Sequence, residues 1–510
     1  MKKVNIKNLI LLLCFVTVVS GQTTLNLPEG LGVSNQMEYS YDSDKKQEIF
    51  ENWLNLDYSR GIFSAGIRFD IFQPNDPNPL ISRGKDKYAD ISYKYIGLNL
   101  QDGNNSLDIT VGNFYSLFGR GMLLKSYEDR NLRVDNNLLG VMLDGRYRNL
   151  RLKALTGMAE NSNADRKDVL HAVNLEYKFV DNLKMGASYV SNKPEIDELA
   201  RTSLASVRIE PSFGNFDLYA EYGVKMNDDI TRTKFNGDKD VIGKSFYGNF
   251  NFYVGSFSLV SEYKYYDNFV FASNDGTVIY NTPPSLRKDL TYILLNRHPS
   301  PLNQNNEKGY KFEANYEVND ELSLTAEYAE TKSLDDGSLY QQILGTNNKS
   351  SAVLKEYYFQ ADKYWGESVK SILVGAYNEE MASNTENLTF IFDNSFYLDD
   401  ENTIKFVFEH QQTKNNITSE EYFDDIFLVE WQNSPSISIA FVSEMKTTEP
   451  SQGNKVRRFW NYLQFGYNWN NHTDINVTIG NRQAGNICIG GICRYEPEFN
   501  GVELKMVTRL

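Results

Sequence analysis

A segment that mixes basic and acidic side chains lies between residues 114 and 140. Its sequence, FYSLFGRGMLLKSYEDRNLRVDNNLLG, is nearly balanced in charge, whereas the whole chain has a formal net charge of −15. Opposite charges this close in sequence form ion pairs that can hold a loop in a fixed shape. Two arrangements are open: a loop folded inward that lines or constricts a lumen, and a packed surface loop held by the same pairs. The charged residues are Arg120, Lys125, Glu128, Asp129, Arg130, Arg133 and Asp135.

Phosphate and nucleic-acid binding are both disfavoured. The tripeptide Gly119-Arg120-Gly121 is not a phosphate loop, because it lacks a Gly-Lys-Ser/Thr ending and a following helix. The chain has 52 Lys and Arg against 67 Asp and Glu, so it lacks the basic surface that a nucleic-acid backbone requires.

Two of the three cysteines lie in the stretch NICIGGICRY. Gly490-Gly491 suits a two-residue primed turn, because both positions need a positive φ. Cys488 and Cys493 would then face each other, with Cα atoms about 4.5 Å apart, within reach of a disulfide. The alternative is metal binding, but two cysteines without nearby histidines make at most half of a zinc site. We predict a disulfide, no metal and no cofactor.

Catalysis has little support in the sequence. None of the four histidines (His171, His298, His410 and His472) stands beside an evident nucleophile or in a metalloprotease motif. Alternation with apolar neighbours places His171 and His410 on outward faces of strands. The acidic loop pairs Asn75-Asp76 and Asp228-Asp229 fit solvated loops better than calcium sites. We therefore expect no enzyme activity and no catalytic residues.

The elements that position these residues are strands. In residues 308–330, apolar and aromatic side chains alternate with polar ones on both sides of a turn at 318–321. Period-two alternation means strands with two unlike faces. The same pattern recurs near residues 63–71, 183–189, 216–222, 246–252, 404–409, 437–441, 475–479 and 502–510.

The connections alternate in length along the chain. Short turns are expected at 58–61, 101–105, 148–150, 179–182, 211–215, 254–257, 318–321, 364–368, 398–402, 432–436 and 470–473. Longer polar loops are expected at 72–87, 115–138, 159–168, 227–240, 267–307, 333–351, 414–419 and 447–455. Tight turns at one end and longer loops at the other are typical of an outer-membrane barrel. We predict an all-β, transmembrane, antiparallel up-and-down β-barrel of about 24 strands, within 20 to 26, with apolar faces toward lipid and polar faces toward the lumen.

The N-terminus has a basic start followed by an apolar stretch and small residues, which predicts a signal peptide over residues 1–21 and a barrel over 22–510. No later apolar run reaches the roughly 20 residues of a spanning helix. Only about a dozen residues precede the first expected strand, so a TonB-dependent transporter with a plug domain in that place is disfavoured.

Three stretches carry a resemblance to a known family: FGRGMLLKSYEDRNLRVDN, NTPPSLRKDLTYILLNRHP and CIGGICRYEPEFNGVELKMVTRL. With them the chain resembles an uncharacterised outer-membrane β-barrel family of Bacteroidota, a domain-of-unknown-function group. The resemblance implies an outer-membrane barrel and the Cys488–Cys493 pair, but no activity. The final Leu510 departs from the terminal Phe expected of such barrels.

Two functions follow as hypotheses. The first is an outer-membrane pore or transporter whose lumen is narrowed by residues 114–140 and by an ordered lid or inserted plug in 281–306. The second is a scaffold or receptor that binds a lipoprotein or secreted partner through its extracellular loops. In either case the expected partners are outer-membrane lipid and the barrel-insertion machinery.

Overall fold

The computed structural model describes residues 27–73, 88–161, 165–193, 201–227, 241–287, 290–297, 302–334, 352–381, 383–447, 458–469, 472–489 and 492–510. For residues 73, 88, 352, 486–489 and 492–496, the backbone alone is described. The expected signal peptide and the loop pairs Asn75-Asp76 and Asp228-Asp229 lie outside the described residues.

Twenty-four strands form one antiparallel sheet, which confirms the predicted strand number. They are β1 (Leu31–Asp42), β2 (Gln47–Arg60), β3 (Phe63–Gln73), β4 (Tyr88–Asp102), β5 (Asn105–Phe114), β10 (Leu138–Tyr147), β11 (Leu150–Ala159), β12 (Val169–Val180), β13 (Leu183–Lys193), β14 (Thr202–Phe213), β15 (Phe216–Asn227), β16 (Val241–Val254), β17 (Phe257–Asp267), β18 (Asn306–Asn319), β19 (Leu322–Lys332), β20 (Ala352–Tyr364), β21 (Val369–Glu380), β22 (Thr385–Tyr397), β23 (Asn402–Asn415), β24 (Glu421–Asn433), β25 (Ile437–Lys446), β26 (Phe459–Trp469), β27 (Thr473–Arg482) and β30 (Phe499–Arg509).

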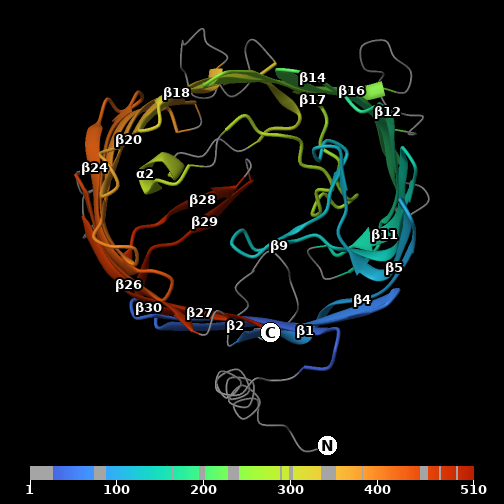
Figure 1. The fold of residues 1–510 in the computed structure, drawn as a ribbon, viewed down its shortest axis with the longest axis horizontal. Helices are drawn as coiled ribbons and strands as arrows, with labels where there is room; N and C mark the ends of the chain where they lie inside the picture. The colour runs from blue at the N-terminus through green and yellow to red at the C-terminus, as the bar shows by residue number, and fades with distance from the viewer. Residues whose placement is uncertain are drawn as a thin grey trace, which may run out of the picture.

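The sheet closes on itself. The first strand, β1, pairs with the last, β30, with Ser34 opposite Arg509 and Asp42 opposite Gly501. Backbone hydrogen bonds of 3.0 and 2.8 Å between Val33 and Leu510 extend this seam. Each of the 24 strands therefore has two neighbours, so the barrel has no unpaired edge, as a membrane interior demands. Figure 1 shows the resulting ring, with further segments inside it.

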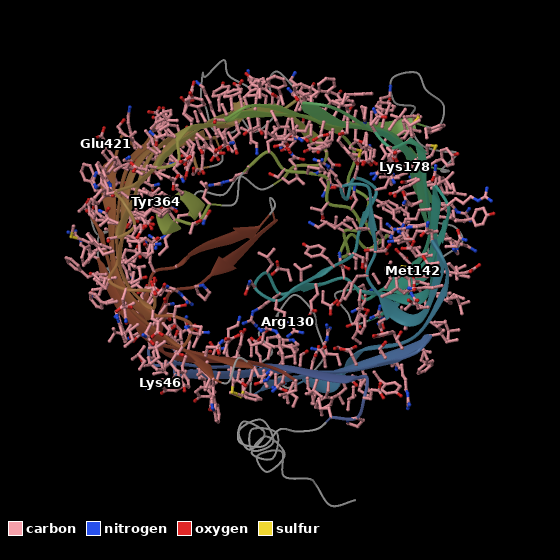
Figure 2. The ribbon with its side chains drawn as sticks, in the orientation of Figure 1. Lys46, Arg130, Met142, Lys178, Tyr364 and Glu421 are labelled. Atoms are coloured by element: carbon pink, nitrogen blue, oxygen red, sulfur yellow. The ribbon has the colours of Figure 1, made fainter. Side chains whose placement is uncertain are left out.

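The two faces of the wall differ in chemistry. Large apolar side chains such as Val111, Val207, Phe312 and Ile479 point outward and are exposed. Inward-pointing positions on the same strands carry many polar and charged groups, of which Arg208 and Glu327 are buried examples. Figure 2 shows side chains on both faces of the ring. Exposed apolar groups over a whole closed surface are stable in lipid rather than water, so the predicted orientation of the faces is confirmed.

A row of tyrosines lies on the outer face of β18 to β21. The ring centroids of Tyr310 and Tyr328 are 5.9 Å apart, those of Tyr328 and Tyr357 are 4.9 Å apart, and those of Tyr357 and Tyr377 are 6.2 Å apart. Tyrosine combines an apolar ring with a polar hydroxyl, and it is favoured where lipid tails meet headgroups. This row marks an interface of the membrane at the end of the barrel that carries the longer loops.

The short turns occur where the alternation of hydrophobicity breaks, at all eleven predicted positions. The turn between β14 and β15 contains Gly214 at φ 53°, a left-handed conformation that glycine adopts without cost. At the opposite end, several connections are long, but those at 43–46, 381–384 and 416–420 are as short as turns. The short-turn end is therefore assigned to the periplasm and the other end to the outside.

Candidate functional site: the loop-filled lumen

Two extracellular connections fold back into the lumen. Inner loop 1 (115–137) contains the short strands β6 (Leu117–Phe118), β7 (Leu124–Lys125), β8 (Glu128–Asp129) and β9 (Val134–Asp135). Inner loop 2 (268–305) contains the helix α2 (Ile293–Asn296). The hairpin of β28 (Gly485–Ile489) and β29 (Ile492–Glu496) also lies within the ring, as do β9 and α2 (Figure 1).

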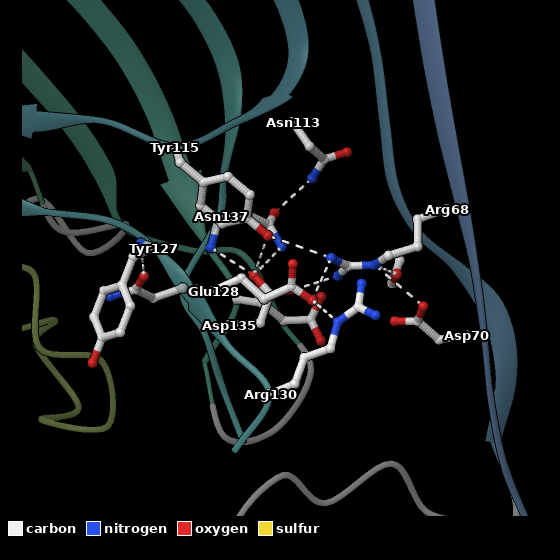
Figure 3. A network of polar contacts seen from close by, with 12 residues as sticks. Arg68, Asp70, Asn113, Tyr115, Tyr127, Glu128, Arg130, Asp135 and Asn137 are labelled. Carbon is white, nitrogen blue, oxygen red and sulfur yellow. Dashed lines mark hydrogen bonds and ion pairs between the residues drawn. The ribbon is translucent and has the colours of Figure 1, made fainter. Parts of the chain in front are cut away.

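Arg68 on β3 fastens inner loop 1 to the wall. Its side chain is only 5% exposed and contacts Asp70 of the same strand at 3.2 Å, Glu128 at 2.9 Å and Asp135 (Figure 3). Glu128 and Asp135 lie directly opposite each other in the β8–β9 pair, where like charges repel. The Arg68 guanidinium relieves this repulsion because it carries five N–H donors in a planar fork.

Tyr115 completes this cluster. Its hydroxyl donates a hydrogen bond of 3.0 Å to Asp135, and its ring stacks on that of Tyr93 at 5.3 Å. Burial and the negative charge of Asp135 raise the pKa of Tyr115 well above its ordinary value, so the hydroxyl stays protonated and remains a donor.

Arg130 and Arg133 bind the tip of inner loop 1 to β1 and β2. Arg133 pairs with Glu51, a carboxylate that is buried. Arg133 has φ 54°, a left-handed backbone conformation that costs a non-glycine residue about 1 kcal/mol, and the ion pair offsets this cost. Arg130 donates a hydrogen bond of 3.1 Å to Gln36, and its guanidinium lies 5.1 Å from the ring centroid of Trp53.

The other three predicted loop residues act within the lumen at separate places. The Arg120 guanidinium lies over the Tyr219 ring at 4.4 Å, a cation–π contact with β15. The Lys125 ammonium lies 4.7 Å from the Tyr127 ring centroid. Asp129 accepts a hydrogen bond of 2.9 Å from the backbone N–H of Leu132 and closes the β8–β9 turn. Arg130 also pairs with Glu128 at 2.9 Å. The structure thus brings Glu128, Arg130 and Asp135 into one cluster with Arg68 and leaves Arg120 and Lys125 apart from it.

The two inner loops are bonded to each other. The backbone N–H of Lys125 donates to the carbonyl of Tyr280 at 2.8 Å, and that of Thr282 donates to the carbonyl of Gly121 at 3.0 Å. The side-chain amide of Asn281 donates to the carbonyl of Met122 at 3.0 Å. A Cβ atom on Gly121 would lie 2.6 Å from the Thr282 carbonyl oxygen, so this approach requires glycine. The two loops therefore form a single inserted body.

An apolar core lies inside the barrel, between this inserted body and the wall. Phe118, Met122, Leu123 and Leu124 of inner loop 1 are fully buried there. Burying each such side chain is worth about 2 kcal/mol. They pack with the following buried residues of the wall: Leu155, Leu170, Ala172, Val190, Leu204, Tyr219, Tyr247 and Tyr266. The expectation of a polar lumen is therefore incomplete, because the wall becomes apolar wherever inner loops cover it.

The helix α2 is anchored on the opposite side of the lumen. The backbone N–H groups of Ile293 and Leu294 donate to the buried Glu409 carboxylate of β23 at 3.1 and 2.8 Å. Arg297, just after the helix, donates to Glu444 of β25 at 2.7 Å and pairs with Asp424 of β24 at 3.1 Å. The carboxylate satisfies N–H groups that a helix start leaves without partners.

Apolar residues of the same segment fill the space beneath α2. Leu295 and Tyr292 pack in one cluster with Tyr358, Val374, Ile391 and Val407 of the wall. Burial and the neighbouring Asp393 carboxylate raise the pKa of Tyr292 well above its ordinary value, and its hydroxyl donates to Asp393 at 3.1 Å. The described part of 281–306 is thus ordered and inserted into the barrel.

Asp275 organises the outer tip of inner loop 2. Burial alone would raise its pKa, but hydrogen bonds from Ser273, Thr277 and Asn161 outweigh burial and lower the pKa below its ordinary value. The Ser273 hydroxyl donates at 2.6 Å and the Thr277 backbone N–H at 3.0 Å. The ionised carboxylate therefore holds this tip in shape.

A cavity lies beside the inserted body, among the residues that the structure describes. It has a volume of ≈ 610 Å³ and lies between the tip of inner loop 1 and the wall strands from β24 through β27, β30 and β1 to β2. Arg130, Asn131 and Arg133 line it from the loop. Asn476 and Gln464, which point inward from β27 and β26, are exposed to this space.

The remaining candidates are placed as follows. The β28–β29 register sets Cys488 opposite Cys493, as the expected hairpin requires. Their side chains are not among those that the structure describes, so the disulfide stays a prediction.

His171 and His410 lie on outward faces, and His410 contacts Asp425 at 2.6 Å. His472 lies in the turn between β26 and β27, and His298 lies outside the described residues. Within the described part of the chain, no group of three or more His, Cys, Asp or Glu could hold a metal ion.

Sequence reasoning missed three of the residues that hold the inserted body: Arg68, Glu409 and Arg297. Arg68 and Glu409 fit the ordinary alternation of their strands, so nothing local distinguished them from other inward-pointing charges.

Among the described residues, no helix is long and apolar enough to cross a membrane.

The closed wall, its apolar outer face and its polar, loop-filled interior define a β-barrel of the bacterial outer membrane. Within this class, the chain belongs to a family described as "Family of unknown function (DUF6029)", which it matches over residues 1–510.

The chain is similar in fold to several solved barrels. The P pilus usher (PapC) translocation pore is 9% identical, and the match covers 94% of this chain and 99% of that chain with a TM-score of 0.48. The copper transporter OprC is 10% identical, with 94% and 80% covered and a TM-score of 0.46. OccK5 (OpdH) of Pseudomonas aeruginosa is 12% identical, with 79% and 97% covered and a TM-score of 0.37. At these values the likeness carries no conclusion about substrate or mechanism. A search of the curated proteins found no match.

Proposed function

We propose that the protein is an outer-membrane pore whose lumen is narrowed by inner loops 1 and 2. The observation that carries this proposal is the cavity of ≈ 610 Å³ beside the inserted body, which is lined mostly by polar residues. A 24-stranded barrel is wide enough for an aqueous channel or a filled lumen. Inner loops that occupy only part of that width leave a narrow polar path.

The charged residues of inner loop 1 form the constriction in this proposal. Arg130 and Arg133 border the cavity. Arg130 is held to the wall by a hydrogen bond to Gln36, and Arg133 is held to the wall by an ion pair with Glu51. A constriction held by ion pairs at a buried wall keeps its shape during passage of a solute, because breaking a buried pair is costly.

Planar-bilayer conductance of the purified protein tests the proposal. The wild-type protein is expected to give small, steady channels. Asn476→Trp, which places a large ring in the open space, is expected to lower the conductance, because Asn476 lines the cavity and is exposed. Asn251→Trp, on the inner face of β16 outside the cavity lining, is the matched control and is expected to conduct as the wild type does.

A sealed scaffold or receptor is the rival function, and the same measurement separates the two. Absence of channels from the wild-type protein, and also from a variant that lacks residues 281–306, would overturn the pore. Co-purification of a lipoprotein or secreted partner after crosslinking in native membranes would then favour the rival.

A further inference from the structure

The charged side chains that border the cavity decide which ions it attracts. Four cationic and four acidic residues line it. A charge that stands in a close ion pair is largely offset by its partner, whereas an unpaired charge acts on every ion that enters. The character of the cavity therefore depends on which of these eight residues lack a partner of opposite sign.

Each of the four cations stands in an ion pair with a carboxylate. The pairs are Arg482–Glu503 at 3.1 Å, Lys505–Glu38 at 2.9 Å, Arg130–Glu128 at 2.9 Å and Arg133–Glu51. The cluster that holds Arg130 has one further cation, Arg68, against three carboxylates, Asp70, Glu128 and Asp135, so it adds no positive excess. Among the described lining residues, no positive charge is therefore left unpaired.

Glu430 of β24 differs from the other acidic lining residues, because no described cation pairs with it. Its carboxylate accepts a hydrogen bond of 2.8 Å from the side-chain amide of Gln432, which is a neutral donor. Lys405 of β23 lies opposite Glu430 in the register, but its ammonium contacts Asp393 at 3.1 Å. Glu430 therefore presents an uncompensated negative charge to the cavity.

The wall beside Glu430 is neutral over three strands. In the register, Glu430 lies opposite Ala440 of β25, which lies opposite Gln464 of β26. The lining residues of β25, β26 and the neighbouring part of β27 carry no charge, and they are Ser438, Ala440, Gln464, Gly466, Asn476 and Thr478. The field of the Glu430 carboxylate is therefore not offset on this side of the cavity.

We propose that the cavity selects small monovalent cations over anions and that the Glu430 carboxylate determines this selectivity. The inference rests on the proposed function in that the cavity lies on the path of the pore. Walls of low dielectric focus the field of a carboxylate into the space between them, which raises the local concentration of cations and lowers that of anions. A single carboxylate does not surround a cation, so the cation can also leave.

A reporter cysteine tests the local charge independently of conduction. Gln464→Cys places a thiol at an exposed position two strand steps from Glu430, which amount to about 10 Å. The detergent-solubilised protein is treated with a cationic and with an anionic methanethiosulfonate reagent. The measured quantity is the ratio of the two reaction rates, relative to the same ratio for free cysteine. Protein without the added cysteine gives the background from Cys488 and Cys493.

Adding Glu430→Gln to this reporter is expected to lower the cation-to-anion rate ratio about threefold at an ionic strength of about 0.01 M, because one charge at about 10 Å acts in opposite directions on the two reagents. At about 1 M salt, where the screening length is about 3 Å, the difference between the two proteins is expected to vanish. A rate ratio that is the same with and without Glu430→Gln at low salt overturns the proposal.

Glu317→Gln is the matched control. Glu317 alternates with the outward-pointing Tyr316 and Val318 of β18, is exposed on the inner face and lies outside the cavity lining. This variant is expected to leave the rate ratio at the reporter unchanged. An equal fall of the ratio in Glu317→Gln and Glu430→Gln would show that the general charge of the lumen acts on the cavity, and it overturns the role of Glu430.

Reversal potentials across bilayers in a potassium chloride gradient separate this inference from the proposed pore. Wild-type channels are expected to prefer K⁺ to Cl⁻, and the Glu430→Gln substitution is expected to reduce this preference. Channels with the same reversal potential in both proteins leave the pore standing and end the role of Glu430. A rate ratio that depends on Glu430 in a protein without channels ends the pore and leaves a cation-selective cavity in a sealed barrel.

Discussion

Replacing Arg68 with methionine is expected to release inner loop 1 from the wall. Methionine keeps the length and apolar stem of the side chain but removes the cation that contacts Asp70, Glu128 and Asp135. Glu128 and Asp135 would then repel each other across the β8–β9 pair and repel Asp70 on the wall. Removing one partner from a buried ion pair costs about 3–5 kcal/mol. At 1.4 kcal/mol for each tenfold change, about 4 kcal/mol raises the undocked fraction of the loop roughly a thousandfold.

Single-channel recording detects the released loop as openings larger than those of the wild type. Trypsin treatment of the protein in proteoliposomes gives a second measurement, because cleavage after Arg130 or Arg133 requires the loop tip to leave its contacts. The Arg68→Met variant is expected to show frequent large openings and cleavage at these two sites.

Arg151→Met is the matched control for this prediction. Arg151 also points into the lumen, where it contacts Asp144 at 2.7 Å, but it holds only neighbouring strands. This variant is expected to keep the conductance and the trypsin resistance of the wild type. If Arg68→Met behaves as Arg151→Met does, the ion-pair cluster does not hold the constriction. Adding Asp70→Asn to Arg68→Met is expected to restore part of the docking, because it removes one of the repelling charges.

Three further predictions concern other parts of the lumen. The Glu409→Gln substitution leaves α2 one neutral acceptor in place of a carboxylate. The rate of hydrogen exchange at the first two amides of the helix is therefore expected to rise about tenfold. An unchanged exchange rate would show that the carboxylate does not hold the helix. Mass spectrometry of the mature protein is expected to find Cys488 and Cys493 joined in a disulfide, whereas thiols that react with an alkylating reagent without prior reduction would refute the bond. Asp275 stabilises the outer tip of inner loop 2 fully above the ordinary aspartate pKa of 3.8, and this stabilisation is lost as the pH falls through the lowered pKa of Asp275 in the folded protein. Protease cleavage of the tip is therefore expected to increase at acid pH in the wild type. In the Asp275→Asn variant, the cleavage is expected to be independent of pH.

The wall of this barrel was readable from the sequence. Alternation such as that of Phe312 and Tyr316 with Glu313 and Glu317 has a period of two, and only strands place alternate side chains on opposite faces. Interruptions of that alternation fixed the turns, since a turn cannot continue the pleat. These are local properties of the chain, so neighbouring residues determine them.

The contents of the lumen were decided by tertiary structure. The sequence of residues 114–140 was compatible with an inward or an outward loop, because its ion pairs could form in either place. The inward position depends on Arg68 and Glu51, which are distant in sequence and look like any other inward-pointing charges. Likewise the inward-pointing side chains of Leu170, Leu204 and Val407 are buried because inner loops cover them.

By itself, the sequence determined a closed, lipid-facing wall of strands, because that requires only local alternation and turn chemistry. Which loops fill the barrel, and which wall strands line the cavity beside them, were set by contacts between residues far apart in the chain. Such contacts arise only when closure of the ring brings those strands together, so the pattern of any one strand could not reveal them.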